Sequence, residues 1–196
     1  NPVNRGQFLK RAFVGGAGAM MVLLLAIAVL SDTVQTSEAV RRKLDVKLFA
    51  TIHHEEKNKT LRTKLKKANK GLLITMPVAS FYFTEEIFKR GTKVDYAARH
   101  GERKVILVTS VAENEGKSTV AANLALSLTQ GERKVLLIDA DLHKAAQYKL
   151  FHRKPAVALA DMLQGEAPYQ PELLEKHNLY TLFSTKSSDG AAELIA

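Results

Sequence analysis

The sequence predicts an α/β fold with a parallel sheet and flanking helices, preceded by one transmembrane helix and a basic linker. Three observations carry this prediction: residues 12–30 contain no charged side chain, residues 104–110 form an apolar run that leads into a GKS sequence, and a second apolar run ends in Asp139 and Asp141. The chain has 196 residues, of which 46% are hydrophobic, enough for a folded core. It contains no cysteine, so disulfides, thiol nucleophiles and thiolate metal sites are excluded.

The net charge of +9 is unevenly distributed along the chain. Residues 1–100 contain 18 Lys and Arg against 8 Asp and Glu, whereas residues 101–196 contain 11 against 12. A globular domain that binds nucleic acid carries its basic residues on the folded part of the chain. The basic character belongs here to the half that holds the apolar segment, so we expect no nucleic-acid partner.

Residues 12–30 are expected to form a transmembrane helix. The uncharged stretch has 19 residues, close to the ~20 needed to cross the hydrocarbon core of a bilayer. A signal peptide is the alternative, because Arg5, Lys10 and Arg11 resemble its basic start, but its apolar region has only ~7–15 residues and ends at a cleavage site that is not evident here. Residues 1–11 would then end an extracytoplasmic region of a longer protein.

Residues 31–80 form a predicted juxtamembrane linker. Within it, residues 47–52 are apolar enough for a short strand, and residues 57–70 contain seven Lys and Arg and no acid. The basic stretch suits either a helix lying on anionic headgroups or a solvated flexible segment. His53 and His54 are adjacent, so on an extended chain their rings point to opposite faces and do not suit one metal ion.

A loop typical of phosphate binding follows residues 104–110, which we expect to be a strand buried on both faces. A helical pattern comes next and extends to Gly131, a residue type common just after helix ends. Strand, GKS loop and helix in this order predict a fold of the P-loop NTPase type. Backbone N–H groups would cradle phosphates, Lys117 would add a cation and Ser118 would ligate Mg²⁺. The predicted nucleotide-binding residues are Asn114, Glu115, Gly116, Lys117, Ser118 and Thr119.

Two carboxylates follow the next apolar run, KVLLIDAD at residues 134–141. The carboxyl ends of strands form the edge at which open α/β sheets bind ligands. Asp139 and Asp141 are two residues apart, so on an extended chain both can face Mg²⁺ and the terminal phosphate. An aspartate at a strand end can instead cap a helix or lie in a loop; the P-loop one helix upstream favours the functional interpretation.

The stretch VILVTSVAENEGKSTVAANLALSLTQGERKVLLIDADLHK resembles the Walker A and Walker A′ region of the bacterial tyrosine kinases (BY-kinases), which regulate the chain length of capsular polysaccharides and exopolysaccharides. The order of a span, a linker and this region also matches that family. The resemblance implies an ATP-dependent protein-tyrosine kinase in the cell membrane, with a cytoplasmic kinase domain at residues 81–196. ATP and Mg²⁺ would be its cofactors. The implied partners are neighbouring subunits, which would be phosphorylated in trans, the cytoplasmic membrane, and the machinery that polymerises and exports the polysaccharide.

The resemblance also implies roles for individual residues. Lys117, Asp139 and Asp141 would be catalytic, and Ser118, Asp139 and Asp141 would ligate the metal ion. Three positions depart from the family: Val111 where Ala or Gly is usual, His143 where Arg is usual and Ala145 where Pro is common. The family's oligomerisation motif, Glu-x-x-Arg-x-x-Arg, corresponds here to Glu86, Lys89 and Thr92. Neither a Walker B strand nor a tyrosine cluster follows Asp141, and we expect both to lie outside this sequence.

Two other functions remain open at this point. One is a P-loop ATPase switch of the chromosome-partitioning or division-site type, which dimerises with nucleotide and transfers no phosphate to protein. Those proteins usually carry an additional lysine early in the loop, where this chain has Ala112-Glu113-Asn114. The other is a chain-length regulator with a degenerate, non-catalytic nucleotide site, against which the intact GKS sequence argues.

Overall fold

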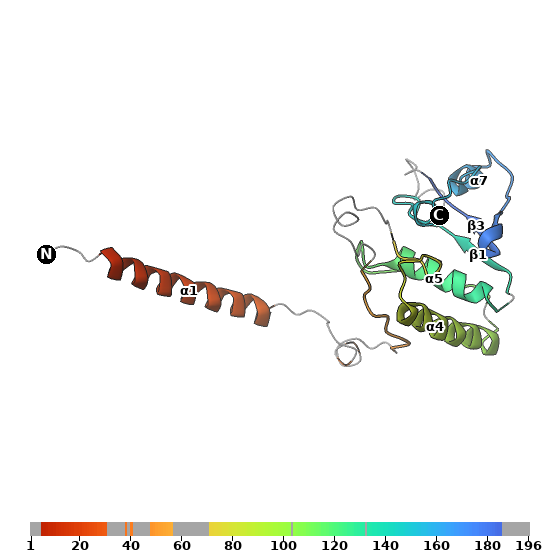
Figure 1. Ribbon diagram of the computed structural model, residues 1–196. Coiled ribbons are helices and arrows are strands. Elements are labelled where there is room, and N and C mark those ends of the chain that lie inside the picture. Colours follow the sequence, from red (N-terminus) through yellow and green to blue (C-terminus); the bar gives the residue numbers. More distant parts are fainter. Residues whose placement is uncertain are drawn as a thin grey trace. The chain divides into compact units, whose positions relative to one another are not determined.

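The structure is a computed structural model that describes residues 5–30, 38, 40, 48–56, 71–102, 104–131 and 133–185. The basic stretch at residues 57–70 lies outside the described residues. The chain consists of two compact units, Asn1–Thr51 and Ile52–Ala196. Figure 1 shows the described elements of each unit.

The first unit contains helix α1, Arg5–Leu30, drawn in red in Figure 1. Its segment Arg5–Ala28 is long and apolar enough to cross a membrane, and none of it is buried within the protein. The helix begins earlier than the predicted start at residue 12. The reason is that Arg and Lys are good helix formers, and their long side chains can extend from a span into the headgroup region.

The second unit contains three strands and four α-helices among its described residues. The helices are α4 (Phe81–His100), α5 (Lys117–Thr129), α6 (Gln147–Leu150) and α7 (Leu159–Leu163). The strands are β1 (Val135–Ile138), β2 (Glu172–Leu174) and β3 (Leu179–Leu182), with the 3-10 helix η1 (Glu175–His177) before β3. Helix α5 ends two residues before Gly131, as predicted, and β1 lies within the predicted strand at residues 134–141.

The sheet has the order β1-β3-β2. Strands β1 and β3 are parallel, with Val135 opposite Leu179, and β2 and β3 are antiparallel, with Glu172 opposite Thr181. The α/β class is confirmed, but the described sheet is mixed and not entirely parallel. The physical reason is the short connection through η1, which can join only antiparallel neighbours; a parallel pair needs a crossover of a dozen or more residues.

The structure contradicts two of the predicted strands. One is at residues 104–110, and the other is at residues 47–52, of which residues 48–52 are described. Residues 104–110 have no strand conformation, and the side chains of Val105 and Leu107 are 87% and 86% exposed. A strand is stabilised by ladder hydrogen bonds to a neighbour and by side-chain packing, and no described strand pairs with either segment. Apolar composition alone therefore does not produce the strand.

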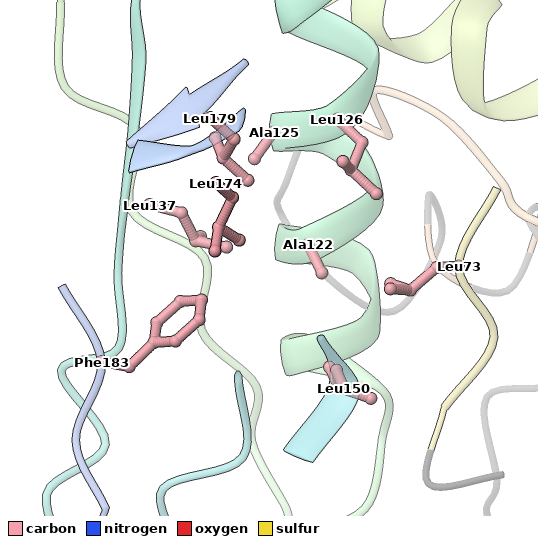
Figure 2. Close-up of a cluster of buried hydrophobic side chains, with 9 residues drawn as sticks. All are labelled: Leu73, Ala122, Ala125, Leu126, Leu137, Leu150, Leu174, Leu179 and Phe183. Carbon is pink, nitrogen blue, oxygen red and sulfur yellow. The ribbon is translucent and has the colours of Figure 1, made fainter. Parts of the chain in front are cut away.

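A hydrophobic core surrounds α5. Figure 2 shows the core leucines of the three strands on one side of this helix and Leu73 on the other. Ala122 is fully buried and Leu126 is 2% exposed, and each fully buried leucine contributes about 1.5–3 kcal/mol. The cluster consists of Leu73, Ala122, Ala125, Leu126, Leu137, Leu150, Leu174, Leu179 and Phe183. This packing fixes α5 against the sheet and so sets the position of its first residue, Lys117.

Candidate active site

The loop before α5 has the backbone shape that exposes N–H groups at a helix start. Gly116 is the N-cap of α5 with φ of 92°, and Asn114 has φ of 64°. A glycine is needed at residue 116 because this left-handed conformation is costly for other residues. The first N–H groups of α5 lack partners within the helix and lie at the positive end of its dipole. The arrangement is that of an anion-binding helix terminus.

A carboxylate already occupies part of this loop. Glu115 Oε2 accepts hydrogen bonds from the backbone N–H groups of Val111 at 3.0 Å and Ala112 at 3.1 Å. The loop amides therefore converge on an anionic oxygen. Glu115 itself can serve a phosphate only through its backbone, because its carboxylate would repel the phosphate.

Lys117 and Asp141 meet across the site. Lys117 Nζ lies 2.9 Å from Asp141 Oδ2, and Asp141 Oδ1 accepts from the backbone N–H of Lys144 at 2.8 Å. Burial raises the pKa of Asp141, but hydrogen bonds from Lys117 and Lys144 and the attraction of Lys117 outweigh it, so the pKa is lowered overall. The hydrogen bond to Asp141 raises the pKa of Lys117. Both groups are thus charged near neutral pH.

Asp139 has a structural task in this arrangement. It is 5% exposed, and its Oδ2 accepts from the backbone N–H groups of Ala146 and Gln147, both at 2.9 Å. Burial raises its pKa; the hydrogen bonds lower it in part, and the nearby Asp141 raises it further, so the pKa is above its usual value. The capping role considered as an alternative for a strand-end aspartate is therefore present at Asp139.

One glutamine and one asparagine side chain connect α5 to its surroundings, and neither was predicted from the sequence. Gln147 Nε2 donates to the carbonyl of Ser118 at 3.0 Å. The fully buried Asn123 donates to the carbonyls of Leu72 at 2.7 Å and Thr119 at 2.9 Å. A polar residue on the apolar face of the predicted helix was the available signal for Asn123; Gln147 carries no such local signal.

A cavity of about 620 Å³ adjoins the loop. Four predicted nucleotide-binding residues line it together with the linker segment 52–56, whereas Lys117, Ser118, Asp139 and Asp141 do not. The lining residues from the loop and its helix are Asn114, Glu115, Gly116, Thr119, Val120 and Asn123. Its volume lies within the usual ~300–1,000 Å³ range of small-molecule sites.

Hydrogen bonds hold the linker segment, residues 52–56, to α4 and its N-cap beside this cavity. His53 Nδ1 lies 3.1 Å from Glu86 Oε2, which also accepts from the His53 backbone N–H at 3.2 Å. Burial raises the pKa of Glu86, but the hydrogen bonds from His53 and the attraction of His53 and Arg90 outweigh it and lower the pKa overall. Glu55 accepts from the Ser80 hydroxyl at 2.6 Å. The glutamate of the predicted oligomerisation motif is therefore already engaged within its own chain.

The sequence is similar to that of known nucleotide-binding proteins and tyrosine kinases. Residues 106–170 match the family described as CobQ/CobB/MinD/ParA nucleotide binding domain. The chain is 24% identical over 187 residues to the tyrosine-protein kinase ptk of Acinetobacter johnsonii, covering 94% of this chain and 25% of that protein. It is 36% identical over 108 residues to the tyrosine-protein kinase YwqD of Bacillus subtilis, covering 54% and 45%. The chain is therefore similar in sequence to bacterial tyrosine kinases over the aligned residues.

The likeness to a solved BY-kinase extends to the fold. The BceF tyrosine kinase domain superposes with a TM-score of 0.70 at 18% identity, over 83% of this chain and 66% of that domain. This similarity confirms the fold that the resemblance implied. The chain spans from about a quarter to less than half of the two BY-kinase relatives named above.

Proposed function

We propose that this chain is part of a membrane-anchored, ATP-dependent protein-tyrosine kinase that phosphorylates neighbouring copies of itself and regulates the chain length and export of a capsular polysaccharide or exopolysaccharide. The observation that carries the proposal is the pairing of Lys117, at the start of α5, with Asp141, just beyond β1, at 2.9 Å. The pairing joins a phosphate-binding loop to a carboxylate pair, the two components that phosphoryl transfer requires. The kinase names of the curated relatives favour this function over an ATPase switch.

The loop supplies the phosphate site of the proposed enzyme. Backbone N–H groups at the start of α5 bind phosphate oxygens, and Lys117 adds a positive charge. Lys117 is 33% exposed, so it can exchange Asp141 for a phosphate oxygen without unfolding its surroundings. Thr119 and Gly116 border the cavity of about 620 Å³, which has room for the nucleoside.

The donor set suits Mg²⁺ held together with a nucleotide. Mg²⁺ prefers oxygen ligands and is commonly bound by one or two carboxylates, substrate phosphates and waters. Ser118, Asp139 and Asp141 offer one hydroxyl and two carboxylates, and we assign them as its ligands. When bound, Mg²⁺ would offset the negative charge that develops on the phosphates. Asp139 and Asp141 would also assist the acceptor tyrosine hydroxyl, as the resemblance to the BY-kinases implies.

The proposed topology places residues 12–30 in the membrane, residues 31–80 in a juxtamembrane linker and the kinase domain, residues 81–196, in the cytoplasm, where ATP is available. Residues 1–11 would face the outside. Protease added to intact cells, or to protoplasts where a wall limits access, should leave the kinase domain uncut. Cleavage near Lys117 under these conditions would contradict the topology.

The fate of the γ-phosphate separates the kinase from the ATPase switch. The native protein is incubated with γ-labelled ATP and Mg²⁺, together with a tagged copy carrying Lys117→Met. A kinase that acts in trans transfers label to tyrosines of the tagged copy, which cannot phosphorylate itself. A switch releases the label only as inorganic phosphate, and that result would overturn the proposed function.

A further inference from the structure

Gln147 is buried at the junction between the loop helix and the aspartate-bearing segment. Its side chain is 3% exposed. Its backbone N–H donates to Asp139 Oδ2 at 2.9 Å, while its side-chain Nε2 donates to the Ser118 carbonyl at 3.0 Å. One residue therefore holds both a proposed metal ligand on the helix and a proposed metal ligand at the end of β1, through two separate groups.

The side-chain oxygen of Gln147 takes no part in these hydrogen bonds. Among the described residues, Gln147 Oε1 is the one buried side-chain polar atom that has no hydrogen-bond partner. Exchanging the amide oxygen and nitrogen would not help, because two oxygens would then face each other at Ser118. A buried acceptor without a donor is unfavourable, so this oxygen is expected to accept from a water or from a bound group.

We propose that Gln147 is a positioning residue of the nucleotide site, which fixes Ser118 relative to Asp139 and whose Oε1 accepts a hydrogen bond when metal and nucleotide are bound. This inference rests on the proposed function. The donors that accompany Mg²⁺ are its water ligands, of which it usually keeps several. Residues that orient metal ligands typically change metal affinity or activity by about 10–100-fold when they are replaced.

Gln147→Met tests the side chain alone. Methionine has a similar length and no amide, and the backbone hydrogen bond to Asp139 remains. We measure the affinity for ADP with and without Mg²⁺ in the native protein, and the kcat and KM of tyrosine phosphorylation. Gln130→Met is the matched control, because Gln130 is exposed at the far end of α5. For Gln147→Met we expect the factor by which Mg²⁺ increases ADP affinity to fall by about 10-fold or more. The kcat should fall with it, while the metal-free ADP affinity stays unchanged.

A second variant, Gln147→Glu, keeps the proposal falsifiable if Gln147→Met does not fold. A carboxylate cannot donate to Ser118, but a protonated carboxyl can. The effect of Mg²⁺ on ADP affinity in this variant, relative to the unsubstituted protein at each pH, should therefore recover as the pH is lowered. A purely packing role predicts that metal-free ADP affinity recovers with pH by the same factor as the affinity with Mg²⁺.

The outcomes separate the two proposals. If the unsubstituted protein does not bind Mg²⁺ and ADP together, the proposed function fails. If it binds them and the folded Gln147 variants respond to Mg²⁺ as Gln130→Met does, the role of Gln147 is refuted while the proposed function stands.

Discussion

The Lys117–Asp141 pair provides a quantitative test of the site. At 2.9 Å, two unit charges attract each other by about 6 kcal/mol at an effective dielectric constant of ~20. The side chains are 33% and 24% exposed, so solvent screening and desolvation offset most of this attraction. We expect a net coupling of about 0.5–1 kcal/mol, as for other partly exposed pairs. The pair therefore contributes little to folding, and under the proposed function Lys117 exchanges Asp141 for phosphate.

Opposite effects on nucleotide binding follow from that exchange. Lys117→Met removes a charge-assisted hydrogen bond worth about 1.5–3 kcal/mol and should weaken ADP binding by about 10–100-fold. Asp141→Asn removes the carboxylate that competes with phosphate for Lys117, so metal-free ADP binding should become tighter while phosphorylation falls. Calorimetric titration with ADP in EDTA measures the affinities, and urea unfolding of the single and double variants measures the coupling. Weaker metal-free ADP binding by folded Asp141→Asn would refute the exchange.

The pair also predicts a pH dependence of stability. The pKa of Asp141 is lowered from 3.8, so its contribution is present above that value and is lost as the pH falls through the lowered pKa. The pKa of Lys117 is raised from 10.5, so its contribution is present below 10.5 and is lost as the pH rises through the raised pKa. The stability difference between the unsubstituted protein and Lys117→Met should be constant between about pH 5 and 9 and shrink below about pH 4. A difference that changes within the neutral range would contradict this assignment.

Substitutions at three other sites, with their controls, test the fold around the active site by urea unfolding. Asp139→Ala leaves one buried and one partly buried backbone N–H group without an acceptor and should cost about 2–4 kcal/mol. Asp139→Asn retains an acceptor oxygen and should stay within about 1 kcal/mol, and equal losses in the two variants would rule out the capping role. In Gly91→Ala the new Cβ would lie 2.9 Å from Ser127 Cβ and closer still to the Ser127 hydroxyl oxygen. We expect this clash to lower the free energy of unfolding by about 1–2 kcal/mol. The additional substitution Ser127→Ala should restore part of that loss, and the control Gly131→Ala should not show it. Asn123→Leu deletes three hydrogen bonds of a fully buried amide and should cost about 2–4 kcal/mol, and a neutral result would show that the connection to residues 72–74 is dispensable.

The parts of the fold that could be predicted are those encoded locally. The helical pattern after the GKS sequence predicts α5, and the apolar run before Asp139 predicts β1. The proximity of Lys117 and Asp141 could be expected because a helix start and the end of a neighbouring strand meet at one edge of an α/β sheet.

The parts that could not be predicted depend on contacts distant in sequence. Residues 104–110 have the composition of a buried strand, yet a strand needs a neighbour, and composition does not reveal whether one is present. The connections of His53 to Glu86 and of Gln147 to Ser118 span 33 and 29 residues. Asp139 shows a further limit, because a strand-end carboxylate can be a metal ligand and a backbone acceptor, and only the hydrogen bonds show that it caps the start of α6.

Phosphotyrosine formation in the native protein tests the central claim most directly. The unsubstituted protein, Lys117→Met and the control Lys134→Met, which alters an exposed lysine just before β1, are incubated separately with ATP and Mg²⁺ and analysed by mass spectrometry. We predict phosphotyrosine in the unsubstituted protein and in Lys134→Met, and its loss in Lys117→Met with the fold retained. Undiminished phosphotyrosine in folded Lys117→Met would show that this loop is not the active site.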